Sequence, residues 1–213
     1  MNFKKISAAI FISLLFVQAF SQIQAVKASI KDPVPNNKFS AGTAYHSFLN
    51  FGEEKTNTQH YEFHFGYRLS PKDKIGIKVA TWKMYAPMGM PMKEQLKFDE
   101  SNNYPGRLRE SGIGLTYQRL LWRGLFATVE ILPQLKTYLD VNENKIGKGF
   151  KLYTTYHLGY HFPLFKNRMY IEPQIHCNYW PIDTNTPSSF KEIEKGWNNY
   201  FLFEPNIYIG IRF

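Results

Sequence analysis

The sequence predicts an all-β protein, an eight-stranded antiparallel up-and-down barrel that spans a membrane. Three observations predict this fold class. The chain begins with an apolar segment that has the form of an export signal, and later segments rich in aromatic and β-branched residues are separated by turn clusters. Within these segments apolar and polar residues alternate, and no stretch shows the spacing of an amphipathic helix.

The first residues have the order of an export signal peptide. Lys4 and Lys5 give a basic start, residues 6–20 are uncharged and apolar, and a small-x-small cleavage site ends at Ser21. Sites that end at Ala25 or Ala28 are alternatives. A retained membrane anchor is the competing interpretation, but a spanning helix needs about 20 apolar residues.

These boundaries divide the chain into three parts. We predict a signal peptide over residues 1–21, a flexible lead containing two prolines over 22–37, and the barrel over 38–213. The single cysteine, Cys177, excludes an internal disulfide. The stability of the barrel must therefore come from backbone pairing and packing.

The net charge of the chain is positive, and it falls from +9 to +7 once the two lysines of the signal are removed. Basic proteins often bind nucleic acid. Here, however, Lys and Arg are dispersed along the chain, and an exported protein meets no genome. An anionic lipid surface is the favoured partner, and no nucleic acid is expected.

Eight strands are predicted. Most of them are long enough for a tilted membrane strand, which needs about 9–11 residues. The predicted strands are 39–49, 60–69, 74–85, 111–121, 125–139, 150–162, 169–180 and 200–213. The short connections are 70–73, 122–124 and 163–168, and the long ones are 50–59, 86–110, 140–149 and 181–199. Short turns at one end and long loops at the other are typical of membrane barrels, whose short turns are periplasmic.

The two faces of each predicted strand differ in polarity. In the last strand one face carries Phe201, Phe203, Pro205, Ile207, Ile209, Ile211 and Phe213. Eight faces rich in aromatic side chains would overfill a barrel interior that is only just wide enough for side chains. We therefore place the glycines and charged residues inside and the apolar faces toward lipid. Three prolines, Pro133, Pro173 and Pro205, fall on the lipid face, where we expect bulges.

The C-terminal segment Ile207-Tyr208-Ile209-Gly210-Ile211-Arg212-Phe213 alternates in polarity and ends in phenylalanine. It resembles the final strand of bacterial outer-membrane barrels, and this resemblance implies recognition of Phe213 by the barrel-assembly machinery. In architecture alone, residues 39–213 resemble the small eight-stranded outer-membrane barrels of the OmpX and OmpA transmembrane types. The resemblance implies an outer-membrane protein with both termini in the periplasm. We expect the chain to differ from the two-part type in having no peptidoglycan-binding domain after the barrel.

Charged residues of both signs are predicted inside the barrel. They are Glu62, Arg68, Lys78, Glu130, Lys136, Lys151, Glu172, Glu204 and Arg212. Because an unpaired buried charge costs several kcal/mol, we expect these acids and bases to pair across the lumen. This structural network is favoured over a channel or an active site.

Histidine could provide metal ligands or a catalytic base. His60 and His64 are four residues apart on a strand, about 13 Å, so the two rings cannot bind one metal ion together, and the same holds for His157 and His161. A hairpin register that pairs residues 180 and 200 places His176 opposite Glu204. We interpret this contact as hydrogen bonding inside the lumen.

The longest predicted loop, 86–110, contains Met88-Gly89-Met90-Pro91-Met92, with three thioethers at alternate positions. Thioethers favour Cu(I), and methionine also makes adaptable contacts with partners. A copper site, an extracellular partner and simple loop packing are all left open by this pattern.

The favoured function is a non-enzymatic outer-membrane protein with an envelope-structural or surface-contact role, acting as a monomer in the lipid bilayer. One alternative is a lipid-modifying enzyme of the lipid A acylase or deacylase type, although no nucleophile motif is visible. A weaker alternative is a small-ligand carrier, which the outward aromatic face opposes. No catalytic residue, metal ligand or cofactor is assigned.

Overall fold

The computed structural model describes residues 37–48, 50, 58–95, 97 and 99–213. The predicted signal peptide at 1–21, and the predicted lead at 22–37 except Asn37, lie outside the described residues.

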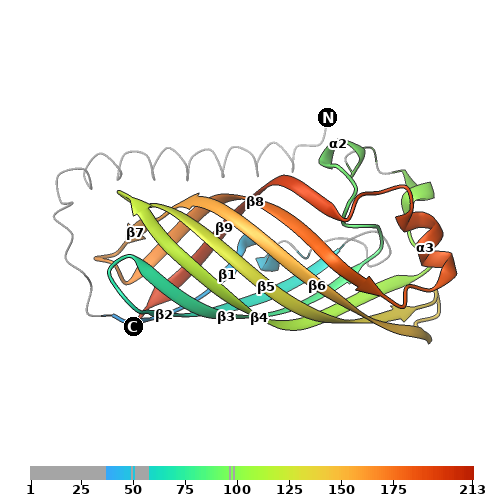
Figure 1. The fold of residues 1–213 in the computed structure, drawn as a ribbon, viewed down its shortest axis with the longest axis horizontal. Coiled ribbons are helices and arrows are strands. Elements are labelled where there is room, and N and C mark those ends of the chain that lie inside the picture. The colour runs from blue at the N-terminus through green and yellow to red at the C-terminus, as the bar shows by residue number, and fades with distance from the viewer. Residues whose placement is uncertain (1–36, 49, 51–57, 96, 98) are drawn as a thin grey trace, which may run out of the picture. The chain divides into compact units, whose positions relative to one another are not determined.

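Eight antiparallel strands form a closed barrel (Figure 1). They are β1 (Phe39–Ala44), β2 (Gln59–Arg68), β3 (Asp73–Met84), β4 (Arg107–Trp122), β5 (Leu125–Leu139), β6 (Lys145–Tyr160), β8 (Met169–Thr184) and β9 (Tyr200–Arg212). Each strand pairs with its neighbours in the order β6-β5-β4-β3-β2-β1-β9-β8, and pairing of β6 with β8 closes the sheet. A short β7 (Phe162–Leu164) follows β6 and pairs with β8. The predicted all-β, eight-stranded up-and-down barrel is confirmed.

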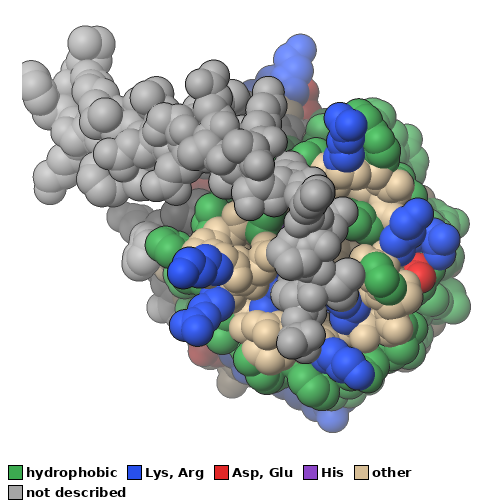
Figure 2. Space-filling view, turned by 90° about the vertical axis from the view of Figure 1, so that its left-hand side faces the viewer, with side chains coloured by type: hydrophobic (Ala, Val, Ile, Leu, Met, Phe, Trp, Pro, Cys, Tyr) green, Lys and Arg blue, Asp and Glu red, His purple; other side chains and the backbone are tan. Residues whose placement is uncertain are grey.

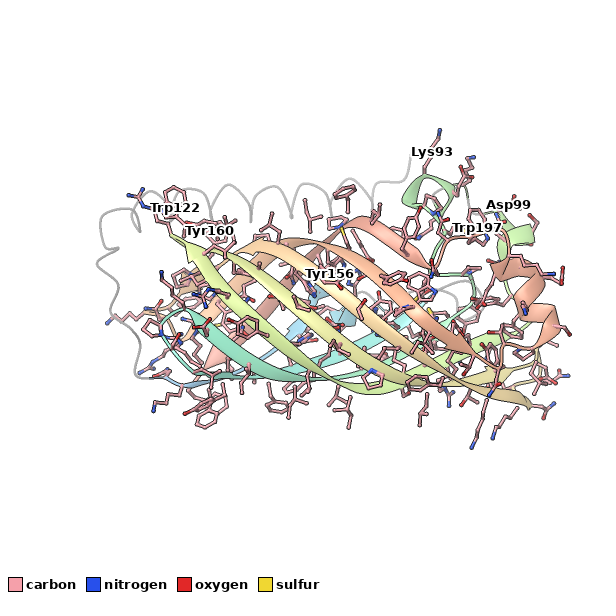
Figure 3. The ribbon with its side chains drawn as sticks, in the orientation of Figure 1. Lys93, Asp99, Trp122, Tyr156, Tyr160 and Trp197 are labelled. Carbon is pink, nitrogen blue, oxygen red and sulfur yellow. The ribbon has the colours of Figure 1, made fainter. Side chains whose placement is uncertain are left out.

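The barrel has a turn end and a loop end. The turn end has the short connections β2–β3, β4–β5 and β7–β8, and there Phe39 and Phe213 exchange backbone hydrogen bonds of 3.0 Å. The loop end has the short helices α2 (Met92–Gln95), η2 (Glu100–Asn102) and α3 (Ser188–Glu194), whereas η1 (Tyr45–Phe48) follows β1 and lies along the wall beside Glu62. Figure 3 shows Trp122 and Tyr160 at the turn end and Lys93, Asp99 and Trp197 at the loop end.

The predicted faces are confirmed in most strands. On the outside Phe65 is 50% exposed and Leu115 is 69% exposed, whereas Lys78 and Glu130 inside are 4% and 1% exposed. The two-residue period predicts the two faces of each strand, and the limited room inside the barrel predicts that the polar face is the inner one.

Three strands extend further toward the loop end than predicted. β4 begins at residue 107 rather than 111, β6 begins at 145 rather than 150, and β8 ends at 184 rather than 180. The outer faces of these extensions mix the polar Arg109, Lys148 and Thr184 with Ile146 and Ile182, so a prediction based on apolar alternation stops too early. The predicted long loop 140–149 is consequently a five-residue turn at 140–144, in which the Asp140 carboxylate accepts hydrogen bonds from two backbone amides.

The first strand is shorter than predicted, because β1 ends at Ala44 and η1 follows it. From Thr43 onward, side chains bind the edge of β2. Thr43 Oγ1 donates to the Glu62 carbonyl at 2.5 Å, and Ser47 Oγ accepts from the Glu62 N–H at 3.3 Å. Asn50 binds both backbone groups of His60. We call the place where the side chains of Thr43, Ser47 and Asn50 bind the edge of β2 the seam.

One predicted face of the last strand is wrong. Phe201 is 7% exposed and faces the interior, whereas Phe203 is 71% exposed. Phe203 has a φ of 59°, and the β8–β9 register shifts between residues 176 and 178. A bulge therefore reverses the alternation before Pro205, as an extra residue in one strand does.

The bulges expected at the other two prolines are not found. The register of β4 with β5 is the same on both sides of Pro133, and the β8–β9 register is continuous through Pro173. The helix α3 was not predicted, because a seven-residue helix is too short for its periodicity to be recognised.

Candidate functional site

Alternation of side chains on β2, β3, β5, β6 and β8 brings buried charges together in the lumen. All the predicted inward charges are buried or half-buried. The structure adds Lys74, Glu110 and Asp183 to this set through ion pairs inside the barrel. Glu110 and Asp183 were missed because they fell in predicted loops. The charges form three clusters along the barrel.

The central cluster is built around Lys78, which lies on β3 between two carboxylates. Its Nζ is 2.9 Å from Glu62 Oε2 and 2.8 Å from Glu130 Oε1. The other contacts of Glu62 are to His60 Nε2 at 2.9 Å and His64 Nε2 at 3.1 Å. The two histidines therefore share one carboxylate.

The outer cluster lies nearer the loop end. Lys151 Nζ is 2.6 Å from Glu110 Oε1 and 3.6 Å from Asp183 Oδ2, and Lys136 pairs with Asp183. Lys136 also donates to Thr186 at 3.1 Å. Two bases and two acids thus neutralise one another where the sequence predicted the bases alone.

The inner cluster lies nearer the turn end. Arg212 donates to His161 Nε2 at 2.6 Å, so the proton of this ring is on Nδ1, which donates to Glu172 Oε1 at 2.8 Å. Lys74 Nζ is 4.0 Å from the same carboxylate oxygen. The geometry fixes one tautomer of His161 and uses both of its nitrogens.

The predicted pairing of His176 with Glu204 is confirmed. The two residues are direct partners in the β8–β9 register, and His176 Nε2 is 2.9 Å from Glu204 Oε2. Asn178 donates to the same oxygen at 2.8 Å. The register that led to this prediction is wrong by one residue near the loop end, where Tyr200 pairs with Tyr179 instead of Trp180. Within the described ranges, no group of three or more His, Cys, Asp or Glu side chains could hold a metal ion.

The lumen is filled over much of its length. A cavity of about 40 Å³ lies between the central and inner clusters, bordered by His157, Tyr170 and Tyr208. It has room for a few water molecules. The inward glycines leave space for larger neighbours, since a Cβ at Gly210 would lie 2.4 Å from the Tyr170 hydroxyl. A larger hollow of about 810 Å³ lies against outward-facing side chains of β2 to β5, including Tyr61.

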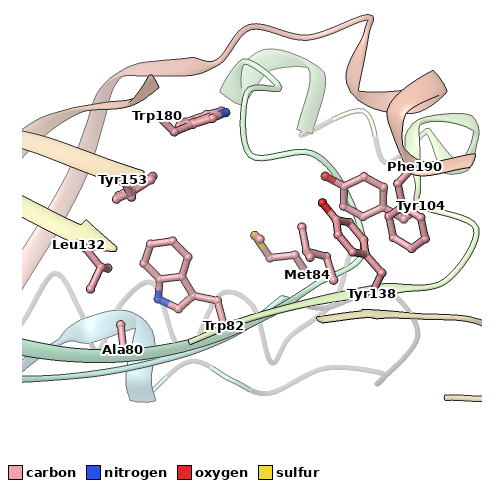
Figure 4. Close-up of a cluster of buried hydrophobic side chains, with 10 residues drawn as sticks. Ala80, Trp82, Met84, Tyr104, Leu132, Tyr138, Tyr153, Trp180 and Phe190 are labelled. Atoms are coloured by element: carbon pink, nitrogen blue, oxygen red, sulfur yellow. The ribbon is translucent and has the colours of Figure 1, made fainter. Parts of the chain in front are cut away.

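Toward the loop end an apolar cluster closes the lumen (Figure 4). Its members are Ala80, Trp82, Met84, Tyr104, Leu108, Leu132, Tyr138, Tyr153, Trp180 and Phe190, with Met88 and Ile193 packed against them. Phe190 of α3 is fully buried, and its ring lies 4.8 Å from that of Tyr104 and 4.9 Å from that of Tyr138. The 185–199 connection therefore packs onto the 85–106 connection.

The predicted methionine motif contributes to this packing. Met90 is 5% exposed, and its carbonyl accepts a hydrogen bond of 2.7 Å from Gln95. Met88 packs against the apolar cluster. These two thioethers thus belong to the packed base of the loops, while the side chain of Met92 lies outside the described residues.

Ionisable groups of the loops respond to the same packing. Burial raises the pKa of the Glu194 carboxyl on α3, which accepts a hydrogen bond of 2.9 Å from the Tyr104 hydroxyl. Burial, followed by the nearby Glu194 charge, raises the pKa of Tyr104 well above its ordinary value. At the exposed end of the loop, hydrogen bonds from Ser101 lower the pKa of Asp99.

Comparison with known proteins gives little further information. No family model matches the chain, and no curated protein matches it. A search of solved structures finds the crystal structure of Neisserial surface protein A, with a TM-score of 0.41 and 11% identity over 83% of this chain and 95% of that chain. None of the helices in the described part of the chain is long and apolar enough to cross a bilayer.

Proposed function

We propose that this chain is a bacterial outer-membrane barrel with a non-enzymatic role, either structural in the envelope or in surface contact through its loops. The observation that carries the proposal is the inverted distribution of polarity. Side chains such as Phe65, Ile113 and Leu115 are 50%, 64% and 69% exposed, whereas Lys78, Glu130 and Lys136 are 4%, 1% and 1% exposed. An apolar surface of this extent is unfavourable in water. In lipid, a closed barrel also satisfies the hydrogen bonds of every backbone group.

The filling of the lumen supports a role outside it. Ligand pockets for drug-sized molecules have volumes of about 300–1,000 Å³, and the lumen cavity has about 40 Å³. The larger hollow lies on the apolar outer wall, where lipid acyl chains would occupy it in a membrane. We therefore favour neither a channel nor a small-ligand carrier.

The remaining features of this proposal concern orientation and assembly. Short turns of membrane barrels face the periplasm, so both ends of the barrel sequence would be periplasmic and the loop end extracellular. The 86–110 segment would then be available to an extracellular partner. Phe213 would be recognised by the barrel-assembly machinery, and the barrel would be a monomer.

Insertion is tested by electrophoresis of the purified protein with and without boiling. We expect an unboiled band that migrates apart from the boiled one, and a requirement for detergent. Leu115→Asp places a charge on the lipid face and should reduce insertion into vesicles, whereas Arg109→Asp on the exposed outer end of β4 should have a smaller effect. A parent protein that stays soluble and monomeric without detergent would exclude the proposal.

A lipid-modifying enzyme is the second candidate, and one observation favours it. At the seam, the Ser47 hydroxyl binds the backbone of Glu62, whose carboxylate contacts His60 and His64. A hydroxyl, an acid and two imidazoles therefore occur in one part of the wall. Release or transfer of a labelled phospholipid acyl chain that Ser47→Ala abolishes would support this candidate over the first.

A further inference from the structure

The surface of the turn end carries charge of nearly one sign. Its exposed basic side chains are Lys38, Lys72, Arg119, Arg123, Lys166 and Arg168, which we call the basic crown. Among the described residues of the three turns and their immediate flanks, the acidic side chain is Asp73. This carboxylate is engaged, because Ser70 and Tyr117 donate to it at 2.6 Å each and Arg119 pairs with it at 2.8 Å.

The loop end has a different pattern of charge. There, acids lie on the same surface as the bases and pair with several of them, as in Lys97 with Glu94 at 2.6 Å and Lys195 with Glu192 at 2.5 Å. Arg107 likewise pairs with Glu143. The positive charge of the turn end is therefore a local property, and it does not simply follow from the net charge of the chain.

Large apolar side chains lie beside the crown. Trp122, Phe165 and Phe213 are 65%, 73% and 59% exposed, and the first two are directly followed by Arg123 and Lys166. In Figure 2, which faces this end, Lys and Arg side chains are spaced around the rim among hydrophobic ones. Aromatic side chains of membrane proteins concentrate at the level of the headgroups, so the adjoining cations would lie at that depth or just beyond it.

Turn geometry does not account for the basic residues. Arg123 has a φ of 44° and Lys166 a φ of 56°, in the left-handed region where Gly and Asn are favoured. Arg123 is also held 5.0 Å from the centre of the Trp122 ring, measured from its Cζ. Two positions that favour small or amide side chains thus carry cations instead.

We propose that the basic crown binds the headgroups of anionic glycerophospholipids, such as phosphatidylglycerol, in the leaflet at the turn end. This inference rests on the proposed function, because it requires an inserted barrel. Lys and Arg close to an anionic membrane surface are attracted by its potential, and Arg can bind phosphate in a bidentate manner. The charge of nearly one sign and the adjoining aromatic residues supply both parts of such a contact.

The test uses tryptophan fluorescence of the full-length barrel in vesicles that contain brominated lipids as quenchers. Trp122 is exposed beside the crown, whereas Trp82 and Trp180 are 2% and 7% exposed inside the barrel. Trp197→Phe removes the tryptophan of the loop end. The measured quantity is the ratio of quenching by brominated phosphatidylglycerol to quenching by brominated phosphatidylcholine. Both leaflets have the same composition, so the direction of insertion does not matter.

We expect the parent to prefer the anionic lipid about five-fold, the ratio that corresponds to one charge contact at a membrane surface. Replacing Lys38, Lys72, Lys166 and Arg168 by Gln should lower the ratio clearly below that of the parent. Arg119 is retained because it pairs with Asp73, and Arg123 because it contacts the reporter. The matched control replaces Lys93, Lys97, Lys191 and Lys195 at the loop end by Gln and should keep the preference. Inorganic phosphate should leave the ratio unchanged.

The outcomes separate this inference from the proposed function. Equal quenching of the parent by the two lipids would overturn the inference and leave insertion intact. Quenching by neither lipid would show that the barrel is not inserted, and the proposed function would fail. Loss of the preference in the loop-end control, or with inorganic phosphate, would also overturn the assignment of headgroup binding to the basic crown.

Discussion

The Asn50 side chain binds both backbone groups of His60, accepting from its N–H at 2.7 Å and donating to its carbonyl at 3.0 Å. Glu62 lies two residues further along β2. Its carbonyl accepts a hydrogen bond from Thr43, and its N–H donates to Ser47. Because β1 ends at Ala44, these four backbone groups have no strand to pair with on the β1 side of β2. At the seam, side chains thus provide hydrogen bonds that backbone pairing provides elsewhere in the barrel.

The first prediction is that Asn50→Ala loosens the seam. Two hydrogen bonds are lost together, so the free energy of unfolding should fall by about 1–3 kcal/mol. Urea unfolding in detergent measures the fall, and amide exchange of His60 should become faster. Asn142→Ala, in the exposed turn between β5 and β6, is the control and should leave both quantities unchanged. Unaltered exchange at His60 in Asn50→Ala would contradict the role of the seam.

The second prediction concerns Lys78, the base shared by two carboxylates in the lumen. Lys78→Met leaves Glu62 and Glu130 buried without their common partner, so the free energy of unfolding should fall by about 3–5 kcal/mol. The exposed Lys72→Met should change it little. Adding Glu130→Gln to Lys78→Met should restore part of the loss. If the double variant is no more stable than Lys78→Met, the charge pair is not what stabilises this region.

The third prediction separates assembly from stability at the last residue of the barrel. The backbone of Phe213 pairs with Phe39, and the two rings stack with centroids 6.1 Å apart. Phe213→Ala keeps the backbone hydrogen bonds, so refolded protein should lose little stability. If the ring is a recognition element for assembly, the amount in the outer membrane of cells should fall much more. Equal amounts of variant and parent in that membrane would argue against recognition through Phe213.

The sequence was sufficient to predict the barrel because the two faces of each strand differ in polarity with a two-residue period, and because the narrow interior has no room for the aromatic faces. The same period placed Lys78, Glu130 and Glu172 inside. It failed at Phe201, because the bulge at Phe203 reverses the two faces. A bulge adds one residue without changing the composition of the strand, so the sequence pattern did not indicate it.

The lumen site was less predictable than the fold. Bases such as Lys136 and Lys151 were correctly placed inside, but their partners Glu110 and Asp183 lie where the strands continue beyond the apolar band. Strand pairing there depends on partners distant in the chain. The seam was also not predictable, since its hydrogen bonds depend on where β1 ends rather than on a local pattern.

The fourth prediction is a pH dependence of loop packing. Burial raises the pKa of Glu194 above its ordinary value of 4.5, so the folded loop binds this proton more tightly than the unfolded one. The resulting stabilisation is complete below pH 4.5 and is lost as the pH rises through the raised pKa. The protection of the α3 amides, measured relative to the intrinsic exchange rate at each pH, should therefore fall over that interval. Glu194→Gln should remove the dependence, and an unchanged pH profile in that variant would exclude Glu194 as its cause.

The last prediction fixes the direction of the barrel in the membrane. The 85–106 connection holds exposed residues such as Lys93 and Asp99, while its Met90 packs at the base. Protease added to intact cells should cut within 86–110 and leave the turns at 70–73 and 122–124 protected. Removing residues 88–92 should leave a closed barrel but increase cleavage at 185–199, because the apolar cluster that contains Phe190 loses the packing of Met88. Disrupting the outer membrane before protease treatment is the control and should expose both ends. Cleavage at the two turns in intact cells, with 86–110 protected, would mean that the barrel is inserted in the opposite direction.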